Sequence, residues 1–295
     1  MKKVGVITDS HSGISQKKAE ELGILVLPMP FFLDGKCYYE DKDLTREQFF
    51  EMLDSGVAVS TSQPTPEEVM EIWNKGLEQF EEIVYIPISS GLSGACNTAI
   101  MLAQEESYEG KVFVVDNGRV STPMYRSVLD ALDMIDKGYD AAFIKKSLED
   151  ARDKMSIYVG VDTLKHLREG GRINAATALI GSVLNVKPIL KFDVGLLESY
   201  KSCRGMGKAK KEMIAAMKQD LETKFKEWYD KGEVYLLAAS SASEKETQDW
   251  VKQIEEAFPG MEVMLGDISF GVSCHVGYGG LGIGCSCKPK YEGEL

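Results

Sequence analysis

The stretch Ile88-Ser-Ser-Gly-Leu-Ser-Gly-Ala-Cys-Asn97 is the segment around which this chain is organised. It follows the apolar run Ile83 to Ile88, which is typical of a buried strand, and precedes Thr98 to Glu106, whose pattern predicts a helix. The sequence therefore predicts a strand, a turn of small residues and a helix start, in that order.

The turn carries the groups that an anion needs. Ser89, Ser90 and Ser93 offer three hydroxyls, while Gly91 and Gly94 allow a ligand to approach the backbone closely. A helix that begins here adds unpaired N–H groups and the positive end of its dipole. A phosphate and a carboxylate fit equally well, and a serine-rich turn that only caps the helix is the alternative interpretation.

The first half of the chain reads as α/β. Apolar runs at 4–8, 24–27, 83–88 and 112–115 alternate with helical patterns near 14–22, 98–106, 122–137 and 140–154. This pattern predicts a mainly parallel, three-layer α/β domain over residues 1–155. Ligands of such sheets bind at the carboxyl ends of strands, so we expect Asp9-Ser10, Ser89 to Gly94 and Asp116-Asn117 to share one cleft.

An excursion from this sheet is predicted near residues 29–40, where Asp34-Gly35 separates two apolar or aromatic flanks in a hairpin pattern. Thr45 and Thr65 each open a helix with capping-box spacing, near 46–54 and 66–80. Between these helices lies Ser60-Thr-Ser-Gln-Pro64, which the proline holds extended. We expect it to present the hydroxyls of Thr61 and Ser62 to a cleft.

The second half, residues 156–295, follows a different pattern. Strands are predicted at 157–161, 188–192, 196–201, 234–240 and 262–266, and helices near 174–185, 207–230 and 244–257. Their irregular alternation predicts an α+β domain with a mixed sheet. Because no Pro-, Gly- or Ser-rich linker separates the halves, we expect a tight contact with the ligand cleft between them.

Two candidate ligand residues stand out in this half. Arg172 follows Gly170-Gly171, a predicted helix stop that would fix the position of its guanidinium. His275 lies in a glycine-rich stretch, Ser273 to Gly282, that fits a tight loop near a ligand. A structural ion pair for Arg172 and a core position for His275 are the alternatives.

A local basic cluster contrasts with the overall charge of −12. Between residues 201 and 211 lie Lys201, Arg204, Lys208, Lys210 and Lys211, which would steer an acidic partner unless they are only a solvated helix start. The acidic balance argues against nucleic acid. No apolar run approaches the length of a membrane span, so we expect no stable membrane insertion and a cytoplasmic location.

The six cysteines are few and irregularly spaced, which disfavours a disulfide framework. Cys274, Cys285 and Cys287 with His275 match no common zinc spacing, so no metal site is expected. Reduced thiols are the better interpretation.

Taken together, the motifs resemble the DegV family of lipid-binding proteins, which includes the fatty-acid-binding subunits of bacterial fatty acid kinase. The segments that carry this resemblance run in family order along nearly the whole chain: Thr8-Asp9-Ser10, Thr61-Ser62-Gln63-Pro64, Ser89 to Gly94 with Asn97, Leu167 to Ile173, Lys187-Pro188-Ile189-Leu190, Arg204-Gly205 and His275-Val276-Gly277. The chain departs from the family pattern at His11, Asn117, Pro123 to Tyr125, Tyr278 and Gly280.

The resemblance implies that a long-chain fatty acid lies between the two halves and that the chain needs no cofactor. On the family pattern, Thr61, Ser62 and Ser93 with the Gly94 backbone would hold the carboxylate, and Arg172 and His275 would border it. The family also implies a non-catalytic subunit that presents the carboxylate to an ATP-dependent kinase, which makes an acyl phosphate. Arg204 would lie on the surface that meets this kinase, beside Lys208 and Lys210.

Two enzymatic alternatives are weaker. A serine hydrolase would use Ser93 as nucleophile and His275 as base, but the Gly91-Leu-Ser-Gly-Ala95 turn lacks the second glycine of a nucleophile elbow and no acidic residue is marked to orient His275. A phosphotransfer or sugar-phosphate enzyme would need a phosphate-binding Walker loop or a metal-binding carboxylate cluster, and the sequence has neither.

Overall fold

The first half of the chain forms a four-stranded sheet, sheet A, in which all strands are parallel. The computed structural model describes residues 2–173, 186–193 and 195–290. The strands of sheet A, in spatial order, are β2 (Leu25–Leu27), β1 (Lys2–Asp9), β6 (Phe80–Ile86) and β7 (Val112–Val114). Strand order reverses between β1 and β6, and at such a point the loops after the strands diverge and leave a crevice.

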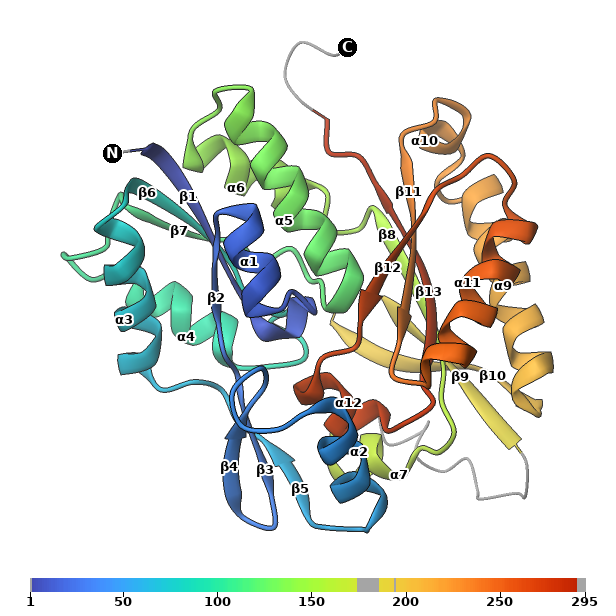
Figure 1. The fold of residues 1–295 in the computed structure, drawn as a ribbon. Helices are drawn as coiled ribbons and strands as arrows, with labels where there is room; N and C mark the ends of the chain where they lie inside the picture. The colour runs from blue at the N-terminus through green and yellow to red at the C-terminus, as the bar shows by residue number, and fades with distance from the viewer. Residues whose placement is uncertain (1, 174–185, 194, 291–295) are drawn as a thin grey trace.

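Helices cover both faces of sheet A (Figure 1). One face packs against α1 (Gln16–Leu22), α5 (Ser121–Asp136) and α6 (Ala141–Asp150). The other packs against α3 (Pro66–Leu77) and α4 (Ala95–Leu102). The predicted three-layer arrangement is confirmed, although α4 begins at Ala95 and not at Thr98.

The predicted hairpin is also confirmed, and it belongs to a small antiparallel sheet. That sheet contains β4 (Lys36–Tyr39), β3 (Pro30–Leu33) and β5 (Val59–Thr61). The segment we expected only to be extended therefore supplies a third strand, β5. The capping boxes at Thr45 and Thr65 open α2 (Arg46–Asp54) and α3 as predicted.

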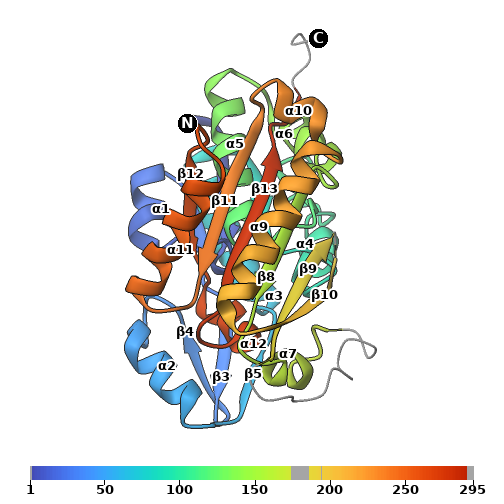
Figure 2. The ribbon, with the colours of Figure 1, turned by 90° about the vertical axis from the view of Figure 1, so that its right-hand side faces the viewer.

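The second half forms a six-stranded mixed sheet, sheet C, as predicted. Its strands, in spatial order, are β10 (Leu196–Arg204), β9 (Val186–Asp193), β8 (Met155–Gly160), β13 (Leu281–Cys287), β11 (Val234–Ser240) and β12 (Val263–Asp267). Among these six strands as described, β11 and β12 pair in parallel and the other neighbours pair antiparallel. Two helices, α9 (Met206–Glu222) and α11 (Glu244–Ala257), cover the outer face of this sheet (Figure 2).

Two expectations for this half were wrong, and one strand had not been predicted. The predicted helix 207–230 breaks at Thr223, whose backbone is not helical, and resumes as α10 (Lys226–Asp230). The glycine-rich stretch that includes His275 is in part a helix, α12 (Phe270–Val276). The chain around Cys285 is β13, a central and fully buried strand. It was not predicted because glycine, which is depleted in strands, occupies alternate positions between its apolar residues. The predicted helix 174–185 lies outside the described residues.

The two halves pack closely. The buried Arg119 donates hydrogen bonds to Ser286 Oγ on β13 at 2.8 Å and to the carbonyl oxygen of Ala151 at 3.1 Å. The serine turn meets the β9–β10 hairpin so tightly that a Cβ atom on Gly91 would lie 2.2 Å from the Gly195 backbone. The division into domains 1–155 and 156–295 stays a prediction. None of the helices in the described ranges is long and apolar enough to span a membrane.

Candidate functional site

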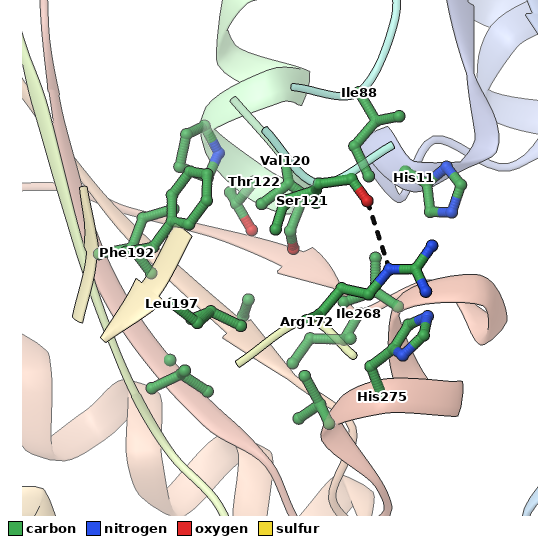
Figure 3. Close-up of a pocket in the computed structure, with 18 of the residues that line it drawn as sticks. His11, Ile88, Val120, Ser121, Thr122, Arg172, Phe192, Leu197, Ile268 and His275 are labelled. Carbon is green, nitrogen blue, oxygen red and sulfur yellow. Dashed lines mark hydrogen bonds between the residues drawn. The ribbon is translucent and has the colours of Figure 1, made fainter. Parts of the chain in front are cut away.

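A pocket lies where the carboxyl ends of β1 and β6 face the inner side of sheet C. Its empty space, counted together with the part that is open to solvent, is about 1000 Å³. The wall is mostly apolar and combines residues from both halves, among them Ile88, Val120, Val159, Phe192, Leu197 and Ile268. Figure 3 shows Arg172, His275 and His11 on one side of the pocket and Phe192 and Leu197 on the other.

Three of the predicted hydroxyl residues, Thr61, Ser62 and Ser93, line this pocket. β5 ends at Thr61, and the serine turn supplies Ser93. Ser93 Oγ accepts a hydrogen bond from the N–H of Ala95 at 3.2 Å, so its own proton remains available to a ligand. Ser62 is exposed, and its hydroxyl donates to the carbonyl oxygen of Gln63 at 3.0 Å.

The other groups of the serine turn have structural roles. Ser90 Oγ donates to Asp116 Oδ2 at 2.6 Å, and Ser89 Oγ accepts from the N–H of Gly91 at 3.2 Å. Gly94 does not line the pocket; a Cβ there would lie 2.9 Å from Gln63 Oε1. Only Ser93 of the three serines therefore faces the pocket.

Arg172 enters the pocket from the end of the short helix α7 (Lys165–Glu169). The predicted helix stop is confirmed, because Gly171 has a φ of +68° that suits glycine. Arg172 Nε donates to the carbonyl oxygen of Leu92 at 3.3 Å, and its Nη1 donates to that of Gly170. No carboxylate in the described ranges pairs with Arg172, which argues against the ion-pair alternative.

His275 lies on α12, which aromatic packing fixes in place. The ring of Phe270, at the start of this helix, stacks on that of Phe49 with centroids 4.4 Å apart. His275 Nε2 lies 2.9 Å from Thr61 Oγ1, and its Nδ1 is buried without a partner. Burial, and then the charge of Arg172, lower the pKa of His275 to about 3, so the ring is neutral at pH 7.

His11 is a pocket residue that the sequence did not identify as one. It follows β1 in a single turn of 3-10 helix, and its Nδ1 lies 3.1 Å from Oδ1 of the fully buried Asp9. Asp9 Oδ2 accepts the N–H of Ile88 at 2.8 Å. The ends of β1 and β6 therefore meet, but the expected shared cleft is only partly correct. Ser93 lines the pocket, whereas Asp9, Ser10, Asp116 and Asn117 do not.

The start of α5 supplies two further lining residues that we had not predicted, Ser121 and Thr122. Thr122 Oγ1 donates to the carbonyl oxygen of Ala238 on β11 at 2.9 Å. The sequence did not identify these two residues as pocket residues, because the segment after Asp116 departs from the family pattern.

The predicted docking residues do not line the pocket. Arg204 ends β10, and Lys208 and Lys210 lie in the first turns of α9. Arg204 and Lys208 are exposed, whereas the ammonium group of Lys210 lies 5.7 Å from the ring centroid of Trp250. The basic cluster is therefore partly solvated and partly anchored to the helix layer outside sheet C.

The arrangement does not form a catalytic triad. His275 Nε2 bonds to Thr61 and not to Ser93, and no carboxylate among the described residues pairs with its Nδ1 to orient the ring as a base. Among the described residues, no three of His, Cys, Asp or Glu gather as a metal site would require. Cys274 packs in the aromatic cluster beside α2, whereas Cys285 and Cys287 lie in the core beneath α9.

Fold and pocket together define a class of α/β proteins with a parallel and a mixed sheet that enclose a largely apolar pocket. This chain belongs to the DegV family: a family model described as an uncharacterised protein of the DegV family matches residues 3–288. A DegV domain-containing protein of Deinococcus radiodurans is 33% identical over 207 residues, which cover 70% of this chain and 73% of that protein. One from Staphylococcus aureus is 28% identical over 284 residues, 96% of this chain and 98% of its own length.

Solved structures match the whole fold. A DegV family protein from Thermus thermophilus, described by its fatty acid binding, has a TM-score of 0.84 and 27% identity, with 97% of this chain and 99% of that chain covered. DegV of Bacillus subtilis, described as a fatty acid binding protein, has a TM-score of 0.82 and 26% identity, with 98% and 100% covered. The predicted family and fold class are thus confirmed.

Proposed function

We propose that this chain binds a long-chain fatty acid in the pocket between its two sheets. The observation that carries the proposal is the division of the pocket: hydroxyls and a guanidinium lie at one end, and mostly apolar side chains line the remainder. Relatives that are described as fatty-acid-binding proteins, and that exceed 25% identity over nearly the whole chain, support it.

The polar end suits a carboxylate. Thr61 and Ser93 can donate hydroxyl protons, and Ser62 can do so if its hydroxyl turns away from the carbonyl oxygen of Gln63. The start of α4 next to Gly94 adds the positive end of a helix dipole, and Arg172 keeps N–H groups beyond its two carbonyl bonds. A buried carboxylate is costly unless such donors meet it. We therefore propose that the carboxylate binds at Thr61, Ser62 and Ser93, bordered by Arg172 and neutral His275. The Gly94 backbone, which does not line the pocket, would contribute through the helix start that follows it.

The apolar wall suits the acyl chain. Burial of roughly fourteen methylenes at ~0.8 kcal/mol each gives about 11 kcal/mol before the costs of association. This is enough for a bound acid to survive purification. Mass spectrometry of the small molecules released from denatured protein should detect a fatty acid, and a polar metabolite in its place would contradict the proposal.

Ser93→Ala tests the placement of the carboxylate. Loss of one hydrogen bond to a charged acceptor costs ~1.5–3 kcal/mol, or about 10- to 150-fold in affinity. Ser90→Ala is the matched control, because it removes a hydroxyl of the same turn that is bonded to Asp116 and does not line the pocket. Unchanged fatty-acid affinity in a folded Ser93→Ala protein would disprove this placement.

We further propose that the chain is not a catalyst and presents the carboxylate to a separate ATP-dependent kinase, which forms an acyl phosphate. The absence of a nucleotide-binding loop in the sequence and of a triad at Ser93 supports this role. The purified chain with ATP and fatty acid should make no acyl phosphate, and it should not hydrolyse esters. Either activity, in the absence of a second protein, would contradict the proposal.

A further inference from the structure

Ser121 is a polar group in the pocket wall that the proposed carboxylate site does not use. It is the first residue of α5, the residue is only 8% exposed, and its Oγ has no hydrogen-bond partner among the residues that the structure describes. A buried hydroxyl without a partner destabilises the folded protein. A partner supplied by a ligand would remove that cost.

The backbone conformation of Ser121 is a second unfavourable feature of this residue. Its φ of +55° is unusual for a residue with a side chain, so the surrounding structure holds it in a strained conformation. The neighbouring Thr122 shows the contrast, because its hydroxyl is satisfied by the carbonyl oxygen of Ala238. Of the two hydroxyls at this helix start, only that of Ser121 is left for a ligand.

The start of α5 adds further donors. This helix has 16 residues, and its N-cap, Val120, offers no side-chain hydrogen bond to the first turn. The N–H groups of Ser121 and Thr122 precede the first intrahelical bond, and with the positive end of the helix dipole they lie beside the Ser121 hydroxyl. Pro123, the next residue, has no N–H and is, with Val120, an apolar neighbour in the pocket wall. The site favours an oxygen atom on an otherwise apolar ligand.

The position of Ser121 separates this site from the carboxylate site. In Figure 3, Ser121 lies between the side with Arg172 and His275 and the side with Phe192 and Leu197. A carboxylate favours the end that contains the guanidinium. A ligand oxygen that binds at Ser121 would therefore belong to the acyl chain and not to the carboxylate headgroup.

We propose that Ser121 and the N-terminus of α5 form a second polar subsite, which binds a hydroxyl group on the acyl chain and makes the protein a receptor for hydroxy fatty acids. A chain hydroxyl can accept from the backbone N–H groups and exchange a hydrogen bond with Ser121 Oγ. This inference rests on the proposed binding of fatty acids and names the class of fatty acid.

The test uses the full chain after removal of bound lipid. Isothermal titration calorimetry measures a series of straight-chain monohydroxy fatty acids, with the hydroxyl at successive carbons, against the unsubstituted acid of equal length. At least one isomer should bind about three- to ten-fold tighter than its unsubstituted partner, the gain expected from one neutral hydrogen bond. Ser121→Ala should abolish that preference.

Two further variants make the result specific. Ser121→Gly removes the hydroxyl and also suits the positive φ, so it covers the case in which alanine disturbs the fold. Ser93→Ala should lower the affinity for the hydroxy acid and for the unsubstituted acid by the same factor, so the ratio of the two affinities should not change. The subsite is disproved if no isomer is preferred, as when water satisfies Ser121, or if the preference survives in both Ser121 variants. If neither acid binds, the proposed function itself fails, and the subsite with it.

Discussion

Thr61 Oγ1 and His275 Nε2 lie 2.9 Å apart although 214 positions separate them in the chain. β5 of the small sheet brings one residue, and α12 brings the other. The contact joins the two halves of the chain at the polar end of the pocket. A change at either residue should therefore affect both ligand affinity and the packing of α12 against the small sheet.

Thr61→Val should weaken fatty-acid binding. The variant keeps the shape of the side chain but removes the hydroxyl that pairs with His275 and, on our proposal, donates to the carboxylate. Loss of the charge-assisted bond should lower affinity by about ten-fold or more. Thr61→Ser, which keeps the hydroxyl, is the control for a fluorescence displacement assay. Equal affinities in the two variants would argue against a role for this hydroxyl.

His275 should make the folded state sensitive to acid. Its pKa is lowered from 6.5 to about 3 in the folded protein, so below pH 6.5 the unfolded chain binds a proton that the folded chain does not. Stability should therefore fall as the pH is lowered from 6.5 toward 3, by at most about 1.4 kcal/mol per pH unit from this one group.

Urea unfolding of the protein and of His275→Gln between pH 7 and pH 4 measures this contribution. Glutamine can keep a bond to Thr61 and does not titrate, so the variant should lose less stability in acid. Parallel pH profiles for the two proteins would show that His275 contributes nothing to acid sensitivity.

Gly91→Ala should destabilise the pocket. A Cβ at this position would lie 2.2 Å from backbone atoms of Gly195, so the β9–β10 hairpin or the serine turn must move. We expect a loss of at least about 2 kcal/mol and weaker fatty-acid binding, since Phe192 and Leu197 of that hairpin line the pocket.

The matched control is Gly207→Ala on α9, where an added Cβ meets nothing within 4 Å. Alanine is favoured over glycine inside a helix by about 1 kcal/mol, so this variant should be neutral or more stable. Thermal unfolding of both variants measures the difference, and similar losses would refute the steric argument.

Arg204→Ala should slow coupled phosphorylation and leave fatty-acid binding near normal. Arg204 is exposed at the end of β10 and outside the pocket wall, where an arginine can act as a hot spot for a partner. Lys208→Ala and Lys210→Ala should give milder effects that depend on salt. The assay uses ATP, fatty acid and a fatty acid kinase purified from the same organism.

A structural role for Arg204 predicts a different outcome. The variant would then unfold at a lower temperature, and its remaining folded fraction would couple normally to the kinase. Thermal unfolding measured beside coupled turnover separates the two roles.

The sequence by itself determined the parallel α/β half, the hairpin, the capping boxes at Thr45 and Thr65 and the helix stop before Arg172. Each of these depends on side chains that lie close together in the chain, so local chemistry is sufficient. Residue chemistry singled out six residues of the candidate site, and the family resemblance added the ligand and the role of each. Five of them, all except Gly94, line the pocket.

Only the tertiary structure decided the remaining pocket residues, the position of β13 and the contact between Thr61 and His275. His11 and Ser121 line the pocket because the loop after β1 and the start of α5 converge there, and neither has a local signature of that position. β13 owes its central place to pairing with β8 and β11, which outweighs the weak strand preference of its glycines. The bond between Thr61 and His275 depends on how two distant segments pack, and no pattern along the chain encodes that distance.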